Sequence, residues 1–380
     1  MDEQRLGCDE PTPVAKPTVR SFATFRRQPT PTPNKHQQQQ HLHPALSAMP
    51  NLDMLLLKGP SPDLEEGLNE LRFAILADGI PANSEGMSEL RMYMWLILLN
   101  TPPLKTDVYL DLVRQGASPA HTKIQNDTFR TFQGDPLFRR RVTQNSITRV
   151  LNAVAWRLND AHEARVNGWQ SPPTLSEFGG SPDTAIMSRH SLAVSVRTDA
   201  STTNDAEQIG YVQGMNVLCG PFLYAARSEV EAFTGFERLI TQECPGYVRG
   251  SMEGVHKGVA LVDRVLQVVD EKLYAHLMSY HMEAKIYAFA SVLTMCACTS
   301  PLPEVLKLWD FLFAYGPHLN ILCIVAQLVL MRNDLLNSSS PNQKLRSFPA
   351  LNAGAIIPLA TGFTSKIPED MYEEIVSHAK

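Results

Sequence analysis

Apolar side chains recur at helical spacing along most of the chain between residues 63 and 340. Leu64, Leu68 and Leu71 lie three or four positions apart, so one face of a helix is apolar there. Similar apolar stretches, read as helices, lie at 87–99, 147–158, 255–273, 286–296, 304–313 and 319–336. Alternation with a period of two, which is typical of strands, is scarce. The pattern predicts an all-α domain.

Three stretches fall outside this pattern. Residues 1–62 hold many prolines and a tract of glutamines at 37–40, which predicts a disordered arm. Residues 161–206 are rich in Ser, Thr, Asp, Gly and Pro. Because helical patterns continue on both sides, we interpret this stretch as a flexible insertion inside one domain spanning 63–340. Residues 341–380 mix short apolar and polar pieces, and we assign them to a C-terminal tail.

Composition and charge exclude several classes of function. Hydrophobic residues make up 44% of the 380 residues and the net charge is −5, so neither a nucleic-acid partner nor a basic membrane-binding face is expected. The longest apolar runs, 286–298 and 319–331, are shorter than the roughly 20 residues that span a bilayer. The six cysteines form no CxxC pair and the N-terminus has no apolar signal region. We expect a cytoplasmic protein with free thiols.

The familiar catalytic motifs are missing. The chain contains no GxxxxGK[ST], GxSxG or HExxH, so we do not expect it to be a P-loop GTPase, a serine hydrolase or a zinc protease. The histidines lack metal-ligand spacing. No cofactor and no metal are expected.

Three short strings carry the remaining candidate chemistry: RMYMW at 91–95, IQNDTFR at 124–130 and GYVQGMN at 210–216. Arg91 and Trp95 lie four positions apart, so they share a helix face. Taken alone, Arg91 is most simply a surface arginine stacked beside a core tryptophan.

The other two strings also have ordinary structural explanations. Asp127 and Arg130 lie three positions apart and could form a helical ion pair worth a few tenths of a kcal/mol. Gln213 alone could be a glutamine on a helix surface. Tyr211 lies two residues before it, and the glycines on either side would let another backbone approach closely.

In this order the strings resemble RxxxW, IxxDxxR and YxQ, the signature motifs of the TBC family of GTPase-activating proteins. The run SPLPEVLKLWDFLFAYG at 300–316 resembles the later helix of that family with its Trp-Asp pair. The resemblance covers about 74–340. The sequence at 126–156, NDTFRTFQGDPLFRRRVTQNSITRVLNAVAW, resembles that of fungal GAP subunits that restrain mitotic exit and septation.

The resemblance implies a fold of two helical lobes with a cleft between them. It also implies a partner, a small Ras-like GTPase carrying GTP and Mg²⁺, whose hydrolysis is accelerated by residues supplied in trans. Arg130 matches the family's arginine finger and Gln213 its glutamine finger. The two are 213 − 130 = 83 positions apart, which is wide for the family, and the insertion at 161–206 accounts for the excess.

The remaining residues of the motifs would support the two fingers. Asp127 would anchor the arginine, Tyr211 would fix the glutamine loop, and Arg91 and Trp95 would be framework for the same cleft. The chain would activate an enzyme rather than be one.

The resemblance further implies a scaffold co-GAP subunit, a role in the spindle checkpoint and a place at the spindle pole body. Two alternatives stay open. One is a Rab-directed GAP of membrane traffic with the same mechanism, and the other is a non-catalytic helical scaffold with an unused cleft.

Overall fold

The computed structural model describes residues 51–103, 105–166 and 210–380, and these parts of the chain contain no strand. The all-α prediction is confirmed. The first helices are α3 (Leu52–Lys58), α4 (Leu64–Asp78), α5 (Arg91–Leu98), α6 (Thr106–Arg114), α7 (His121–Thr128), α8 (Pro136–Arg141), α9 (Gln144–Val166), α10 (Met215–Ala225) and α11 (Glu229–Arg238).

A π-helical turn, η2 (Leu239–Glu243), and a short 3₁₀ turn, η3 (Pro245–Tyr247), lead into the second half. It contains α12 (Glu253–Val269), α13 (Glu271–Ser279), α14 (Ala284–Tyr287), α15 (Phe289–Leu293), α16 (Leu302–Tyr315), the 3₁₀ turn η4 (Pro317–Leu319), α17 (Asn320–Leu330), α18 (Arg332–Leu336), α19 (Pro341–Leu345), α20 (Ala353–Phe363) and α21 (Glu369–Ser377).

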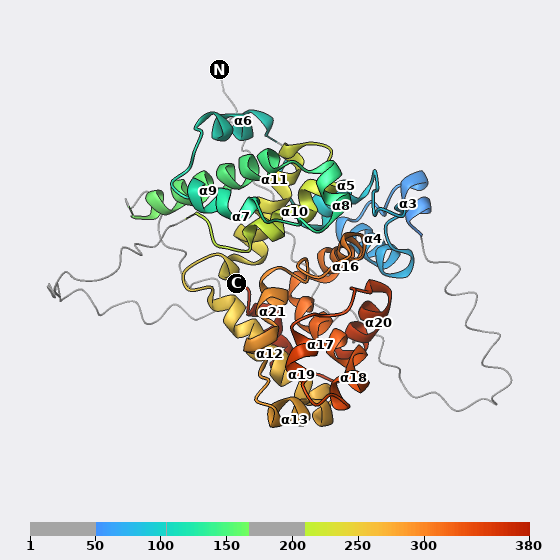
Figure 1. Cartoon of the computed structure of the whole chain (residues 1–380). Helices are drawn as coiled ribbons and strands as arrows, with labels where there is room; N and C mark the ends of the chain where they lie inside the picture. Colours follow the sequence, from blue (N-terminus) through green and yellow to red (C-terminus); the bar gives the residue numbers. More distant parts are fainter. Residues whose placement is uncertain (1–50, 104, 167–209) are drawn as a thin grey trace, which may run out of the picture.

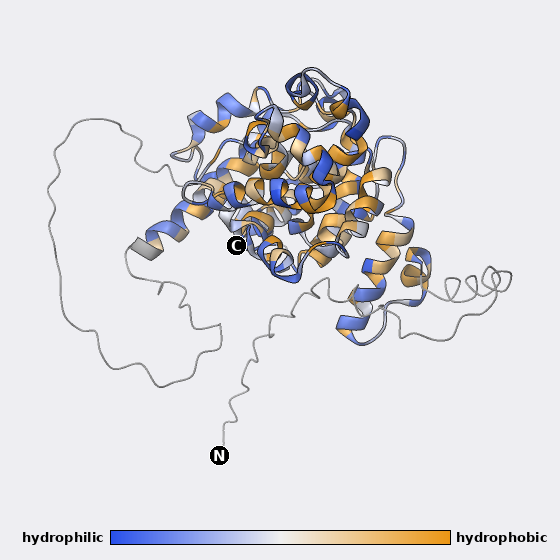
Figure 2. Cartoon of the chain, turned by 90° about the horizontal axis from the view of Figure 1, so that it is seen from below, coloured by the Kyte–Doolittle hydropathy of each residue, from blue (hydrophilic) through white to orange (hydrophobic). Residues whose placement is uncertain are grey.

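The helices form two lobes. Figure 1 shows α6, α7 and α9–α11 gathered in one lobe, which we call the N-terminal lobe, and α12, α13 and α17–α21 in the other, the C-terminal lobe. Helix α16 lies between them and packs on α4, α5 and α10 on one side and on α20 on the other. Figure 2 shows hydrophobic residues concentrated where helices face one another.

The centre of this packing is a cluster of aromatic rings. Trp95 of α5 lies with its ring centroid 5.0 Å from Phe313 and 5.8 Å from Trp309, both on α16. Phe222 of α10 meets Trp95 edge to face at 5.6 Å. Both tryptophans and Phe222 are fully buried. These rings fix α5 and α10, the two helices that follow or carry signature strings, against α16.

Some predicted helices are divided by polar or irregular residues. The stretch 255–273 is two helices, because Asp270 leaves helical geometry (φ −147°, ψ 80°) and its side chain accepts a hydrogen bond from the amide of Leu273. This carboxylate therefore ends α12 and caps α13. The stretch 286–296 is likewise divided at Ala288 between α14 and α15.

The predicted boundary at residue 340 is wrong. Helix α20 packs on α17 and α16, and α21 packs on η4. Ala353 and Ile375 are completely buried. Residues 341–380 are part of the C-terminal lobe rather than a tail, because their short apolar pieces fall on helix faces that meet that lobe.

The predicted arm and insertion lie mostly outside the described residues. Of the 1–62 arm, residues 51–62 are described and include α3, which packs on α4. Of the 161–206 insertion, residues 161–166 are the last turns of α9.

Candidate functional site

The RxxxW string forms a buried ion-pair framework. Both nitrogens on one side of the Arg91 guanidinium donate to Asp310 of α16, with Nε 2.9 Å from Oδ1 and Nη2 3.0 Å from Oδ2. The indole Nε1 of Trp95 donates to the same Oδ1 at 2.7 Å. Full burial raises the pKa of Asp310, and the adjacent guanidinium opposes that rise.

Arg91 is therefore not a surface arginine, and that prediction is wrong. Its side chain is 1% exposed, and its Nη1 donates to the backbone carbonyl of Gly86. The helical spacing correctly placed it beside Trp95 on one face. That face can lie in the core because the carboxylate of Asp310, on α16, neutralises the charge of Arg91. Arg91 joins α5 to α16 through Asp310.

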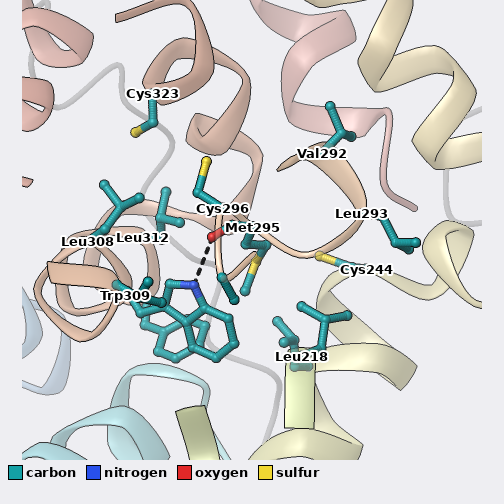
Figure 3. Packing of buried hydrophobic residues seen from close by; sticks show 14 of the residues in the cluster. Leu218, Cys244, Val292, Leu293, Met295, Cys296, Leu308, Trp309, Leu312 and Cys323 are labelled. Carbon is teal, nitrogen blue, oxygen red and sulfur yellow. Dashed lines mark hydrogen bonds between the residues drawn. The ribbon is translucent and has the colours of Figure 1, made fainter. Parts of the chain in front are cut away.

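The neighbour of Asp310 on α16 serves a different part of the molecule. Trp309 donates its Nε1 hydrogen to the carbonyl of Met295, at 2.9 Å, in the turn that follows α15 (Figure 3). Two consecutive residues of α16 thus hold α5 and the turn at 294–297 at the same time.

The IxxDxxR string lies at the end of α7. Asp127 is 6% exposed, and its Oδ1 is 2.6 Å from Nη2 of Arg130. The Arg130 side chain is 58% exposed. Within the described part of the chain, its guanidinium makes no other side-chain hydrogen bond. The ordinary ion pair expected from the spacing is present, and most of the guanidinium faces solvent.

Asp127 also joins this string to the YxQ string. Its second oxygen, Oδ2, accepts a hydrogen bond of 2.8 Å from the phenol of Tyr211. Burial, followed by the bond to Asp127, raises the pKa of Tyr211 well above that of a free phenol, so the hydroxyl remains a neutral donor. One buried carboxylate therefore links two strings that lie more than 80 residues apart in sequence.

Two polar residues that the sequence did not single out complete the link. Asn216 accepts from the amide of Gly214 at 3.0 Å and donates from Nδ2 to the Thr131 hydroxyl at 2.8 Å. Thr131 in turn donates to the carbonyl of Asp127 at 2.8 Å. Both residues lie inside or directly beside the strings, so the sequence places them near the candidate site. It does not predict that they pair with each other across 85 residues.

Gln213 lies on the turn that leads into α10 and is exposed. Its side chain makes no hydrogen bond within the described residues. The turn is shaped by Gly210 (φ 118°) and Gly214 (φ 110°), a backbone region that side chains with a Cβ rarely adopt. A Cβ on Gly210 would lie 2.9 Å from the carbonyl oxygen of Ala155. The close backbone approach expected of these glycines is confirmed at Gly210, whereas at Gly214 the neighbour is the side chain of Leu293.

The two phenylalanines of the loop that follows α7 lie in different environments. Phe132 packs its ring 4.7 Å from that of Phe138 and presses against the backbone of Gly220. Phe129 is 67% exposed and directly precedes Arg130. Next to this loop lies a hollow of about 390 Å³, lined by Phe132, Gly134, Asp135, Pro136, Ala297, Cys298, Ser300 and Pro301.

Residues 51–103, 105–166 and 210–380 contain no group of three or more His, Cys, Asp or Glu side chains that could hold a metal ion. In the same ranges no helix is both long enough and apolar enough to cross a membrane. The cysteines described there are all free, and only Cys298 is exposed.

Comparisons with known proteins identify the family of this chain. Residues 201–336 match the model of the Rab-GTPase-TBC domain. The chain is 40% identical over 335 residues to cell division control protein 16 of Schizosaccharomyces pombe, which covers 87% of this chain and 96% of that protein. It is 36% identical over 327 residues to mitotic check point protein BUB2 of Saccharomyces cerevisiae, covering 85% and 95% respectively.

A solved structure supports the fold. The crystal structure of the Ypt/Rab-GAP domain of Gyp1p superimposes with a TM-score of 0.55 at 16% identity, covering 78% of this chain and 92% of that one. The identity and coverage of the two fungal relatives extend the likeness well beyond the matched domain. The chain belongs to the Rab-GTPase-TBC domain family.

Proposed function

We propose that this chain stimulates GTP hydrolysis by a small Ras-like GTPase, to which it supplies Arg130 and Gln213. The observation that carries the proposal is the shared carboxylate of Asp127. It binds Arg130 with one oxygen and Tyr211 with the other, so the arginine loop and the glutamine turn are held as one unit. Both proposed fingers remain exposed on that unit.

Arginine suits the charge that develops during phosphoryl transfer. The transition state spreads negative charge over the γ-phosphoryl oxygens and the bridging oxygen, and a planar, permanently charged guanidinium can donate several hydrogen bonds to them. One nitrogen of Arg130 stays on Asp127, which limits the rotation of the side chain, and the others are free to reach a phosphate. GTP and Mg²⁺ would arrive bound to the partner.

Glutamine suits the other half of the reaction. Its amide has both a donor and an acceptor, so Gln213 can orient the attacking water in line with the γ-phosphate. Exposure of the side chain is a requirement for this role, because the water belongs to the partner's nucleotide site.

The target GTPase is proposed from the relatives. Two relatives that match most of this chain are named for cell division control and a mitotic check point, which favours a GTPase of mitotic exit and septation. We also propose a scaffold co-GAP subunit and a place at the spindle pole body. The names of the family model and of the similar crystal structure favour a Rab GTPase as the second candidate.

The test is single-turnover GTP hydrolysis by a panel of purified Ras-like and Rab GTPases, with and without this protein. Stimulation of one member that is lost in Arg130→Ala and in Gln213→Ala supports the proposal and names the target. Arg114 is a matched control, because it is also exposed and pairs with an aspartate three residues before it, at 2.7 Å. Binding without stimulation, unchanged by these substitutions, would favour the scaffold alternative.

A further inference from the structure

The turn that carries Gln213 is contacted by a side chain from the other half of the chain. Leu293, the last residue of α15, is 6% exposed. A Cβ built on Gly214 would lie only 2.6 Å from Cδ2 of Leu293. The leucine therefore occupies the space in which any side chain at 214 would lie, directly beside the proposed glutamine finger.

Leu293 is held in this position by the turn that follows it. Met295 (φ 49°) and Cys296 (φ 60°) both lie in the left-handed region, which non-glycine residues adopt only when their surroundings impose it. Two hydrogen bonds do so. Trp309 donates to the carbonyl of Met295 at 2.9 Å (Figure 3), and the amide of Cys296 donates to the carbonyl of Ser291 at 2.9 Å.

The turn that carries Gln213 is itself held by polar contacts on the side away from Leu293. The amide of Gly214 donates to Asn216 at 3.0 Å, and the amide of Val212 donates to the sulfur of Met215 at 3.2 Å. Glycine allows wide backbone rotation, so these bonds alone leave a hinge directly after Gln213. The side chain of Leu293 closes the space into which that hinge could move.

We propose that Leu293 is a positioning residue, which holds the backbone at Gly214 so that Gln213 points toward the partner's nucleotide. The proposal rests on the function proposed above and adds a residue that none of the signature strings contains. Leu293 acts only through Gln213 and touches neither partner nor nucleotide. Displacement of a catalytic group by about 1 Å can lower a rate about 10²-fold.

The neighbouring residue supplies a matched control. Val292 lies on the same helix and is fully buried, but it points at α12, where a Cβ on Gly258 would lie 2.8 Å from Cγ1 of Val292. Figure 3 shows the side chains of Val292 and Leu293 on successive residues. Val292→Ala removes a comparable buried side chain without opening space beside Gly214.

The experiment measures stimulated hydrolysis with the GTPase that responds in the panel, as a function of protein concentration. Leu293→Ala is expected to lower the maximal rate about tenfold or more without changing the concentration for half-maximal stimulation. Leu293→Met, which fills a similar volume, should restore most of the rate. Val292→Ala should keep the maximal rate even where the melting temperature falls. Equal loss in Val292→Ala and Leu293→Ala would overturn the proposal.

Two further measurements isolate the route through Gln213. In a Gln213→Ala background, Leu293→Ala should cause no additional loss, whereas in an Arg130→Ala background it should cause its full loss. Amide hydrogen exchange at 210–216 should quicken in Leu293→Ala and not in Val292→Ala. Unchanged exchange in Leu293→Ala would overturn the positioning role whatever the activity. Full stimulation by Gln213→Ala itself would instead overturn the proposed function.

Discussion

Arg91 and Arg130 each come from a signature string and each pairs with an aspartate, yet they occupy opposite environments. Arg91 is 1% exposed and uses three nitrogens, two on Asp310 and one on a backbone carbonyl. Arg130 is 58% exposed and keeps one nitrogen on Asp127. A guanidinium whose three nitrogens each have a partner inside the core can hold helices together, and one that mostly faces solvent can act on a partner.

The aspartates that bind these two arginines, Asp310 and Asp127, also differ in their other partners. Asp310 receives every hydrogen bond from within the core and joins α5 to α16. Asp127 divides its oxygens between a buried phenol and an exposed guanidinium. The first arrangement contributes mainly to stability. The second transmits the rigidity of the core to a side chain at the surface.

The largest effect on rate is expected at Arg130. Arg130→Ala should slow stimulated hydrolysis about 10³- to 10⁵-fold, because the transition-state charge loses its guanidinium. Arg130→Lys should fail nearly as badly, since an ammonium lacks the planar fork. The free energy of unfolding should change by no more than about 0.5 kcal/mol. Single-turnover hydrolysis measures the loss of rate, and thermal melting measures the change in stability. Full stimulation by Arg130→Ala would contradict the assignment of Arg130, rather than Arg91, as the residue that acts on the partner.

The largest effect on stability is expected at Arg91. Arg91→Ala leaves the buried Asp310 carboxylate without its counter-charge, which should lower the free energy of unfolding by about 3–5 kcal/mol. Chemical denaturation measures this loss. Arg114→Ala, at an exposed pair, should change stability by less than about 1 kcal/mol. A stable Arg91→Ala variant that has lost stimulation would show that Arg91 itself contacts the nucleotide.

A smaller effect is expected at Phe129, which adjoins Arg130 in the chain and is 67% exposed. If Arg130 enters the partner's nucleotide site, the Phe129 ring must lie in the contact. Phe129→Ala should raise KM for the GTPase by a factor corresponding to about 1–2 kcal/mol and leave kcat unchanged.

The control for Phe129 is Leu57→Ala. Leu57 is 83% exposed and lies on α3, which Figure 1 places on the far side of the N-terminal half from α7. This substitution should change neither constant. A fall in kcat for Phe129→Ala with KM unchanged would contradict an affinity role for the ring.

The smallest effect is expected from pH, and it should act on the framework alone. His378 accepts from the Tyr247 hydroxyl at 2.8 Å through Nε2 and lies 2.6 Å from the carbonyl of Ile375 through Nδ1. Burial lowers the pKa of His378 below its ordinary value. The unfolded chain therefore binds this proton more readily, and the stability contributed by neutral His378 is lost as the pH falls below about 6.5.

Melting temperatures at several pH values between neutral and mildly acidic check this sign. The wild-type protein should lose more stability on acidification than His378→Gln, which has no imidazole to protonate. A steeper loss in the variant would contradict the assignment.

Much of the fold could be predicted from the sequence, because apolar residues recur at the helical period in α4, α9, α12 and α16. The breaks inside the predicted helices 255–273 and 286–296 were missed. They depend on single residues such as Asp270, whose capping hydrogen bond forms only in the folded chain. The C-terminal helices were missed because α20 and α21 bury short apolar faces that look like loop sequence in isolation.

The candidate site was predictable where its contacts are local. The spacing of Asp127 and Arg130 predicted their ion pair, and the TBC resemblance is confirmed by the relatives. The environment of Arg91 was not predictable from spacing, because its partner Asp310 lies 219 residues away. The bond between Tyr211 and Asp127 is non-local in the same way. Periodicity identifies which residues share a face but not which distant residue meets that face.

The two neighbours Trp309 and Asp310 give α16 a fixed phase between the lobes. Successive residues of a helix point about 100° apart, so one residue reaches the turn after α15 while the next reaches α5. Inserting or deleting a single residue earlier in α16 would rotate both away from their partners at once. We therefore expect natural length variation in relatives to avoid this helix.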